Sequence, residues 1–355
     1  MRKIHINNVR SGAIIAKHII DQNGRILLAA GTKFKNSYAN KLKKLGIFEL
    51  YIYDDMSEGI EITDAVKEQT RMEARVALQK VADDHMIKDK ISIDQVRSVI
   101  DKIIDELTEN NDILVNLCDI KTYDSYTFDH SVNVCILSML TAIGLGYNKE
   151  RTKELGVGAI LHDIGKLKIP LKILNKPGRL THDEFEEVKK HTIYGYEMLK
   201  KVDSISNISA YVALAHHERY NGTGYPLKKK GKDIHQSARI AAVSDVYDAL
   251  TSNRVYRKRM PPNQALEYIS AFTYQYFDYD VVKSFINNIA IYPVGTGVEL
   301  STGEKCLVVK NYKSMPMRPM VRVIYDSNNN KLKDFYEIDL TKKLNVFIIN
   351  SCDID

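Results

Sequence analysis

The sequence predicts a mainly α-helical protein, built on a helical bundle, with a small mixed α/β domain at its start and a small β module at its end. Apolar residues recur every three or four positions through the middle of the chain, whereas near both ends they come in short or alternating runs between turns. The length of 355 residues is too great for one ordinary hydrophobic core and indicates two or three domains. We place the domain boundaries at 1–58, 59–90 (a connecting helix), 91–290 and 291–355.

Composition and charge exclude several classes of protein. With 44% hydrophobic and 27% charged residues, the chain is typical of a globular protein. The net charge of +6 favours an anionic ligand but is too small for a surface that coats a nucleic-acid polymer. The four cysteines have no paired spacing, which indicates neither a disulfide framework nor a zinc ribbon and suits a reducing cytoplasm.

We expect a cytoplasmic protein without a membrane insertion. Polar residues at His5, Asn7 and Asn8 interrupt any apolar segment of a signal peptide. The longest apolar run, 132–146, contains polar residues and falls short of the ~20 residues that a membrane-spanning helix needs. It is typical of a buried helix instead.

The first 90 residues contain no pattern that indicates chemistry. A turn at 21–25 precedes a short apolar strand at 26–28, and helical spacing over 38–45 precedes a strand at 49–53. The stretch 64–84 is helical and charged, with one narrow apolar stripe. This stripe could pack on its own domain or pair with a second copy of the chain, so a homodimer through the connecting helices is one alternative.

Five helical segments of the central domain each carry an imidazole or a carboxylate beside apolar positions. A single histidine there would most often be a packed core residue, but five within about ninety residues are hard to explain by packing. Facing helices of a bundle commonly build metal sites from such side chains. Seven nitrogen and oxygen donors suffice for two divalent ions such as iron, manganese or zinc, and exclude an iron–sulfur centre. The candidate ligands are His130, His162, Asp163, His191, His216, His217 and Asp245.

The pair His162-Asp163 differs from a second His-Asp pair in its neighbours. The second pair, at 182–183, lies between Thr181 and Glu184, a capping-box pattern that indicates the start of a surface helix. Asp163 has a second carboxylate oxygen that could bridge two ions. Lys166 would lie about one helical turn beyond His162 if the helix persists, where its ammonium could reach a substrate phosphate.

Basic residues and one glycine-rich loop are the candidate substrate contacts. The loop at 222–226 lets the backbone approach a ligand at Gly224, while Tyr225 offers a ring or a hydroxyl to a base or phosphate. Arg254 and Arg257 follow the segment that carries Asp245, and their guanidinium groups could clamp a phosphate or stack on a base. Lys258 and Arg259 follow them, and a solvated helix end is the simpler interpretation of all four.

The segments that carry the candidate ligands and the glycine-rich loop resemble those of the HD superfamily of metal-dependent phosphohydrolases and, within it, the HD-GYP subfamily. The resemblance covers roughly 110–290 and implies a helical bundle that holds two or three metal ions. It implies cyclic di-GMP as the substrate, hydrolysed to linear pGpG and in some members on to GMP, in a bacterial signalling enzyme. It also favours Arg254 and Arg257 as ligand contacts over Lys258 and Arg259. The matching segments are 162–166 with Ile169-Pro170, His191 with Gly195, 216–218 and 222–226.

The sequence departs from this family at two positions. Asn221 stands where the family often has Asp, and Tyr126 stands where three-metal members carry a glutamate one turn before the first histidine. A phenol is a poor substitute for a carboxylate, so we expect two ions, iron or manganese foremost, with zinc, nickel or magnesium as alternatives. Glu218 could orient an imidazole from the second shell, and Asp248 could do the same or act as a cap.

The residues support a two-metal hydrolysis. Two ions bridged by Asp163 would lower the pKa of a shared water from ~15.7 toward ~7, and the resulting hydroxide would attack phosphorus in line. Lys166 would stabilise charge on the phosphoryl oxygens. Asp163 and Lys166 are therefore the predicted catalytic residues. One alternative is a phosphodiesterase for another cyclic dinucleotide, such as 3'3'-cGAMP. A second, prompted by Tyr126 and Asn221, is a protein that binds cyclic di-GMP with little or no hydrolysis.

Beyond residue 290 the pattern changes to alternating apolar positions and short turns. Candidate strands lie at 298–300, 307–309, 321–325 and 346–349, with turns at 302–303 and 328–330. This pattern predicts a small β module. It contains no cluster of potential ligands.

Overall fold

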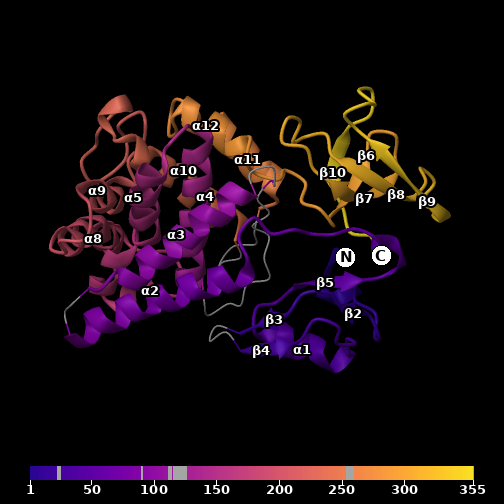
Figure 1. Cartoon of the computed structure of the whole chain (residues 1–355), viewed down its shortest axis with the longest axis horizontal. Helices are drawn as coiled ribbons and strands as arrows, with labels where there is room; N and C mark the ends of the chain where they lie inside the picture. Colours follow the sequence, from indigo (N-terminus) through magenta and orange to yellow (C-terminus); the bar gives the residue numbers. More distant parts are fainter. Residues whose placement is uncertain (22–24, 89–90, 111–113, 115–125, 253–259, 355) are drawn as a thin grey trace.

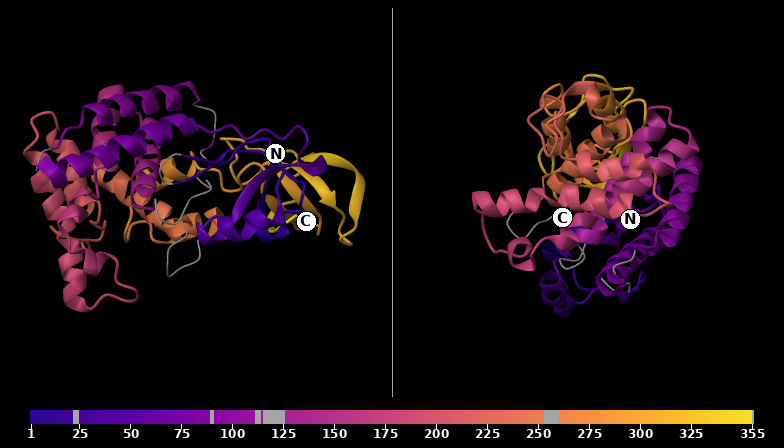
Figure 2. Two further views of the ribbon diagram at one scale, coloured as in Figure 1. Left: turned by 90° about the horizontal axis from the view of Figure 1, so that it is seen from below. Right: turned by 90° about the vertical axis from the view of Figure 1, so that its left-hand side faces the viewer.

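The helices of the middle of the chain and the strands near its two ends form the two halves of an elongated molecule (Figures 1 and 2). The computed structural model describes residues 1–21, 25–88, 91–110, 114, 126–252 and 260–354. The two termini lie close together in the half built from strands. The candidate ligands lie on or beside helices of the middle of the chain. The predicted mainly helical fold is confirmed.

The N-terminal module consists of two small sheets and one helix. Strands β1 (Arg2–His5), β2 (Ile14–Ile15) and β5 (Glu49–Tyr53) form an antiparallel sheet in the order β1-β5-β2, while β3 (Ile19–Ile20) pairs with β4 (Ile26–Leu28). Helix α1 (Asn36–Lys44) and the short 3-10 helices η1 (Ile6–Asn8) and η2 (Asp55–Ser57) complete it. Ile15, Phe34 and Leu50 are buried in its core, where they remove apolar surface from water.

Helices α2 (Glu68–Lys88) and α3 (Asp94–Glu109) pack on the same core as the rest of the helical domain. The apolar stripe of α2 is buried there, with Ala74, Leu78 and Val81 each at most 3% exposed. Of the two alternatives for this stripe, the structure therefore shows packing within its own chain. The connecting helix α2 thus contributes to the core of the helical domain.

Helix α4 (Tyr126–Gly144) runs through the middle of the helical domain and packs against α2, α5, α10 and α12. Its apolar residues, such as Val134 and Leu137, are fully buried, which explains its long apolar run. The segment from Thr181 forms two helices that meet at Lys190. The other helices are α5 (Lys149–Ile160), η4 (Ile164–Lys168), α6 (Leu171–Leu174), α7 (His182–Lys189), α8 (His191–Lys200), α9 (Asn207–Ala215), η5 (Gly231–Asp233), α10 (Gln236–Thr251), α11 (Pro262–Ala271) and α12 (Tyr279–Ile286).

The C-terminal module is a five-stranded antiparallel sheet, which confirms the predicted β module. The strand order is β10-β6-β7-β8-β9, with register pairs such as Gly297↔Leu307 and Val321↔Ile338. The strands are β6 (Gly297–Leu300), β7 (Lys305–Lys310), β8 (Met320–Tyr325), β9 (Lys331–Asp339) and β10 (Ile348–Ser351).

The two terminal modules pack on each other, a contact that the sequence did not indicate. Met56 and Ile60 of the first share a buried cluster with Leu307 and Ile324 of the second. Arg322 adds a hydrogen bond of 2.6 Å from Nη1 to the carbonyl of Glu58. Such contacts between distant positions cannot be read from local patterns, because apolar periodicity shows which face is buried but not against what.

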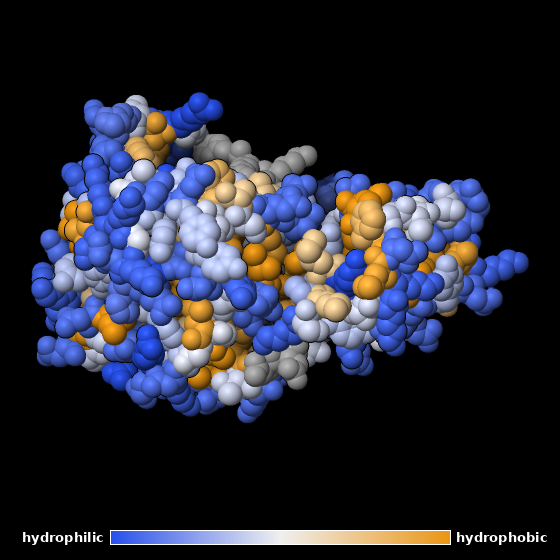
Figure 3. Space-filling model, turned by 90° about the horizontal axis from the view of Figure 1, so that it is seen from above, coloured by the Kyte–Doolittle hydropathy of each residue, from blue (hydrophilic) through white to orange (hydrophobic). Residues whose placement is uncertain are grey.

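Hydrophilic residues cover most of the face drawn in Figure 3. Hydrophobic residues gather mainly near the junction of the helical half with the half built from strands. Among the described residues, no helix combines the length and the apolar character that crossing a bilayer requires.

Candidate metal centre

Three of the candidate histidines sit at helix ends, where a nearby backbone carbonyl fixes the ring. The Nδ1 atoms of His162, His191 and His216 lie 2.7, 2.6 and 2.9 Å from the carbonyl oxygens of Ala159, Val188 and Ala213, each three residues earlier. In a neutral ring, Nδ1 then donates the hydrogen and Nε2 keeps its lone pair. Metal-binding histidines in proteins are commonly oriented by such a hydrogen bond, donated by the ring nitrogen that does not bind the metal.

A glycine contact brings the His162-Asp163 turn against the start of α8. A Cβ atom at Gly165 would lie 1.9 Å from the carbonyl oxygen of His191 and 2.5 Å from the amide nitrogen of Gly195, so only glycine fits there. This contact explains the glycine at position 165, whereas a Cβ at Gly195 would meet its nearest neighbours at 3.4 and 3.6 Å. The same contact places Asp163 beside His191.

The helix on which the expected position of Lys166 depended does not persist, because α5 ends at Ile160 and the chain continues as the 3-10 helix η4. Lys166 Nζ lies 2.5 Å from Asp163 Oδ2. Its side chain is 33% exposed, so it lies between the buried carboxylate and solvent.

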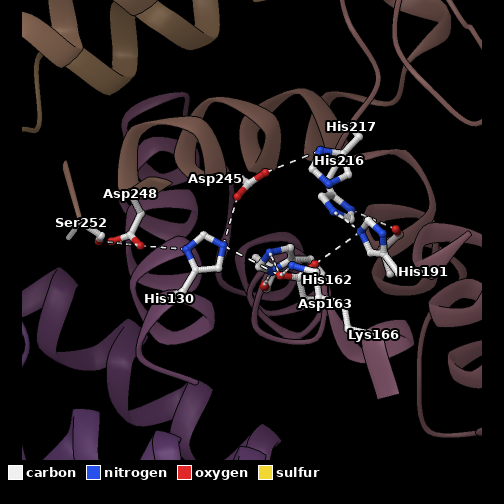
Figure 4. Close-up of polar contacts among 12 residues, drawn as sticks. His130, His162, Asp163, Lys166, His191, His216, His217, Asp245, Asp248 and Ser252 are labelled. Carbon is white, nitrogen blue, oxygen red and sulfur yellow. Dashed lines mark hydrogen bonds and ion pairs between the residues drawn. The ribbon is translucent and has the colours of Figure 1, made fainter. Parts of the chain in front are cut away.

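All seven predicted ligands converge on one place (Figure 4). They form overlapping groups of three residues, and within each group the ligand atoms lie within 4.8 Å of one another. His130 comes from α4, His162 and Asp163 from the turn after α5, His191 from α8, His216 and His217 from the end of α9, and Asp245 from α10. The groups are His130, His162 and Asp245; His191, His216 and His217; and His162, Asp163 and His216.

Asp163 lies between the first two groups. Its Oδ2 atom is 3.4 Å from His162 Nε2 and 4.0 Å from His130 Nε2, whereas its Oδ1 atom is 3.4 Å from His191 Nε2. One carboxylate oxygen therefore faces each group, which is the arrangement that a bridging ligand needs.

Asp245 belongs to the first group but also faces the second. The sequence did not indicate this arrangement. Its Oδ1 atom lies 3.1 Å from His130 Nε2, and its Oδ2 atom lies 3.7 Å from His217 Nδ1. The two carboxylates thus face the same pair of imidazole groups from different helical segments.

The polar atoms of the site are suited to cations. His162 Nε2 and Asp163 Oδ1 are buried and have no hydrogen-bond partner among the described residues. His191 Nε2 lies 3.4 Å from His216 Nε2, so two nitrogens that both carry lone pairs face each other. Buried polar atoms without partners are costly. Divalent ions accepted by these atoms would remove that cost, so the residues fit the metal ions that the sequence predicts.

Electrostatics keep His191, His217 and Asp163 in the protonation states that metal binding requires. Burial lowers the pKa of His191, and it lowers that of His217 to about 3, so these rings are neutral at physiological pH. Although burial favours the neutral acid, Lys166 and His162 hold the pKa of Asp163 well below its usual range. Asp163 is therefore an anion.

His130 is held between two carboxylates. Its Nε2 atom faces Asp245, and its Nδ1 atom lies 2.8 Å from Asp248 Oδ2. Burial disfavours the charged ring, but the hydrogen bonds to Asp245 and Asp248 raise the pKa of His130 to about 9. Of the two roles that the sequence left open for Asp248, the structure shows the one in which it orients an imidazole.

The loop that carries Tyr225 closes one side of the site. The ring of Tyr225 lies 4.8 Å from that of His217, between centroids, and a Cβ at Gly224 would lie 2.3 Å from the amide nitrogen of Arg219. Glu218, predicted as a partner for an imidazole, instead accepts a hydrogen bond of 2.6 Å from the amide of Leu227 and so holds this loop. The side chain of Glu218 therefore points to the loop and not to the histidines.

Asn221 supports the same loop. Its Oδ1 atom accepts hydrogen bonds from the amide and the hydroxyl of Thr223, at 3.0 and 2.7 Å. An aspartate oxygen could accept the same two bonds, so Asn221 retains the turn that an aspartate would make.

Some predicted positions lie outside the described residues. These are the substrate contacts Arg254 and Arg257, the basic residues Lys258 and Arg259, and the side chain of Tyr126. The second His-Asp pair is exposed at the start of α7, where Thr181 and Glu184 form the predicted capping box.

Sequence reasoning missed Asn133 and Arg71. Asn133 Nδ2 donates a hydrogen bond of 2.7 Å to Asp248 Oδ1, and Arg71 Nη2 donates one of 3.3 Å to Asn133 Oδ1. Asn133 could have been found, because it stands three residues after His130 on one helical face. Nothing in the sequence places Arg71 near it.

Comparisons with known families place two matches on the chain. Residues 127–281 match the HD domain, and residues 297–355 match the "KOW domain associated with HD domain". The first match contains all seven candidate ligands. The second covers the C-terminal sheet.

Named relatives match part of the chain. A Pseudomonas aeruginosa protein named cyclic di-GMP phosphodiesterase is 35% identical over 256 residues, which cover 72% of this chain and 62% of that protein. A Vibrio cholerae protein named 3'3'-cGAMP-specific phosphodiesterase 1 is 36% identical over 163 residues, which cover 46% of this chain and 37% of that protein. The chain therefore spans less than two thirds of the length of either relative.

A solved structure shares the fold. A protein from Bdellovibrio bacteriovorus, described as an HDG"Y"P protein, matches 80% of this chain and 97% of its own chain, with a TM-score of 0.51 and 21% sequence identity. At that identity, the likeness concerns the arrangement of the elements.

Proposed function

We propose, from the match of residues 127–281 to the HD domain, that the protein is a metal-dependent phosphodiesterase that hydrolyses cyclic di-GMP. The product is linear pGpG, with GMP as a further product if the reaction continues. The names of the relatives support the substrate, and the net charge of +6 suits an anionic ligand.

One observation carries the proposal. Two groups of nitrogen and oxygen donors lie side by side, and Asp163 presents one carboxylate oxygen to each. An isolated structural ion would need only one such group. A shared carboxylate between two groups is the arrangement of two-metal sites in phosphoryl-transfer enzymes.

The bound group would be two divalent ions, with iron or manganese foremost. The group His130, His162 and Asp245 would hold one ion, and His191, His216 and His217 the other, with Asp163 shared. When bound, such ions polarise a phosphoryl oxygen and acidify water for attack on phosphorus.

Side chains at the mouth of the site would bind and orient the substrate. Lys166 Nζ pairs with Asp163 at the exposed edge, and rotation of its side chain would bring the ammonium to a non-bridging phosphate oxygen. The His217 side chain is 28% exposed and lies beside the Tyr225 ring, so this edge is open to a ligand. The Tyr225 ring would stack on a base or shield the reacting phosphate from water.

A second candidate substrate is 3'3'-cGAMP, because one relative is named for it. Both substrates present the same phosphodiester to the metal ligands, so these residues cannot distinguish them. The choice would be made by residues that touch the bases. A protein that only binds the nucleotide is disfavoured by the complete set of ligands and by Asn221, which retains the turn of the loop.

A product assay tests the proposal. The full chain, purified without oxygen and loaded with Fe(II) or Mn(II), is incubated separately with cyclic di-GMP, 3'3'-cGAMP and cyclic di-AMP, and products are separated by chromatography. We expect pGpG from cyclic di-GMP, dependent on added metal and absent in Asp163→Ala. A metal-loaded chain that binds a cyclic dinucleotide but yields no linear product would overturn the proposal.

A further inference from the structure

Arg71 of α2 is joined to the candidate ligand His130 by a chain of polar contacts through two buried residues. Arg71 Nη2 donates to Asn133 Oδ1 at 3.3 Å, and Asn133 Nδ2 donates to Asp248 Oδ1 at 2.7 Å. Asp248 Oδ2 then accepts from His130 Nδ1 at 2.8 Å. Three helices, α2, α4 and α10, contribute to this chain of contacts.

The chemistry of the end groups allows only one direction for these hydrogen bonds. A guanidinium group only donates and an ionised carboxylate only accepts, so the Asn133 amide must turn its oxygen to Arg71 and its nitrogen to Asp248. Asp248 in turn requires a hydrogen on His130 Nδ1. The lone pair of a neutral ring is thereby left on Nε2, the atom that faces Asp245 and Asp163.

Because these residues are buried, each of their polar groups depends on its hydrogen-bond partner. Asn133, Asp248 and His130 are 2%, 1% and 4% exposed. A metal-bound His130 would be neutral, so it would not cancel the charge of Asp248 in the protein interior. Arg71, through the Asn133 amide, brings a positive charge toward that carboxylate, and Ser252 Oγ contributes a third hydrogen bond to Asp248 at 3.2 Å.

Arg71 also stands where the helical domain meets the N-terminal module. It lines a cavity of about 380 Å³ together with Lys17 and Tyr51 of that module and Asn133 of α4. Lys17 Nζ lies 2.7 Å from Asp64, four residues before α2. The metal ligand His130 is therefore connected to the junction between the two halves of the molecule.

We propose that Arg71 and Asn133 are positioning residues for one of the two metal ions, the ion held by His130, His162 and Asp245. They act through Asp248, which sets the tautomer and orientation of the His130 ring. The contacts that link Arg71 to His130 end at this group, so the ion held by His191, His216 and His217 should be affected less. The inference rests on the proposed metal centre.

Titration of the metal-stripped full chain with Mn(II) tests the proposal. Isothermal titration calorimetry of the wild type should resolve two binding steps. Outer partners of metal ligands typically contribute tenfold to a hundredfold in metal affinity, so Asn133→Ala should weaken one step by about that factor. Arg71→Met, one contact further away, should weaken the same step by roughly threefold to tenfold. Arg71→Lys, which keeps a cationic donor, should recover part of the loss.

Electron paramagnetic resonance gives a second readout that a general loss of stability would not produce. At a Mn(II) concentration that fills both sites of the wild type, Arg71→Met should show less of the spectrum of coupled ions and more of an isolated ion. The matched control is Arg97→Met. It removes an arginine on α3 that makes one long hydrogen bond, 3.4 Å to the carbonyl of Ser204, and it should match the wild type.

The possible results separate this inference from the proposed function. Wild-type affinities and spectra in both Arg71→Met and Asn133→Ala would overturn the inference, as would equal weakening of both binding steps. If Asn133→Ala does not fold, Arg71→Met decides alone, because the Arg71 side chain is partly exposed. A wild-type chain that binds no Mn(II) or Fe(II) would overturn the proposed metal centre itself.

Discussion

Asp248 accepts a hydrogen bond of 2.8 Å from Nδ1 of His130, on the opposite side of the ring from Asp245. The imidazole is thereby held between two carboxylates from one helix, α10. Asp245 faces the other candidate ligands, whereas Asp248 lies on the far side of the ring. This relationship separates a residue that would bind metal from a residue that orients the ligand, although both are aspartates one helical turn apart.

Replacement of Asp248 by asparagine should weaken metal binding without unfolding the protein. An amide can offer either a hydrogen or an oxygen to His130, so the ring loses its fixed tautomer. We expect a tenfold to hundredfold loss of metal affinity, measured by Mn(II) titration, and near-normal circular dichroism. The control is Ser252→Ala, which removes the 3.2 Å bond from Oγ to Asp248 but leaves Asp248 itself in place, and it should retain most of the affinity. Unchanged metal affinity in Asp248→Asn would contradict this role.

The Asp163→Asn substitution should remove bound metal and activity together. Its carboxylate faces both groups of imidazoles, so a neutral amide of the same shape cannot serve both. Elemental analysis should fall well below the two ions expected for the wild type, and the chromatographic assay should show no linear product. Asp183→Asn is the matched control, because it alters the other His-Asp pair, which is exposed on α7. It should keep both metal content and turnover.

Gly165→Ala should destabilise the protein far more than Gly195→Ala, although the two glycines touch. A Cβ at Gly165 would lie 1.9 Å from a backbone oxygen, whereas a Cβ at Gly195 would meet its nearest neighbours at 3.4 and 3.6 Å. We expect Gly165→Ala to lower the free energy of unfolding by about 1–3 kcal/mol or more, measured by urea denaturation, with a loss of metal content. Gly195→Ala should be near neutral. Equal effects would show that the close approach of η4 and α8 is not required.

Tyr225→Ala should impair substrate binding while leaving metal content unchanged. Removal of an aromatic ring that stacks on a base costs about 1–3 kcal/mol, so kcat/KM for cyclic di-GMP should fall roughly fivefold to a hundredfold. Tyr225→Phe retains the ring and separates the contribution of the hydroxyl. If Tyr225→Phe is as impaired as Tyr225→Ala, the hydroxyl and not the ring is the important group. Normal kinetics in both variants would exclude Tyr225 from substrate binding.

Metal removal should lower thermal stability. An ion that binds only the folded state at a hundred times its Kd contributes about 2.7 kcal/mol to the free energy of unfolding. Differential scanning calorimetry should therefore show a higher Tm with Mn(II) than after treatment with a chelator. Asp163→Asn serves as the control, because its Tm should respond little to Mn(II). A wild-type Tm that is independent of metal would contradict the proposed centre.

Much of the helical domain could be predicted from the sequence because its signals are local. The capping box of Thr181 and Glu184 depends on residues three positions apart, and the structure shows it. Apolar periodicity indicated that α4 and the stripe of α2 have buried faces, for the same reason. The position of Lys166 one turn beyond His162 depended on a helix that persists, whereas α5 ends at Ile160 and Gly165 lies in the 3-10 helix η4, against the backbone of α8.

By itself, the sequence determined the ligand chemistry: five imidazoles and two carboxylates within the central domain, without thiolates, next to a glycine-rich loop. Only the tertiary structure decided how these groups are shared, with Asp163 and Asp245 both facing two groups, Asp248 orienting His130, and Glu218 turned to the loop. The physical reason is that residue type sets what an atom can donate or accept, whereas its partner depends on which helices pack together.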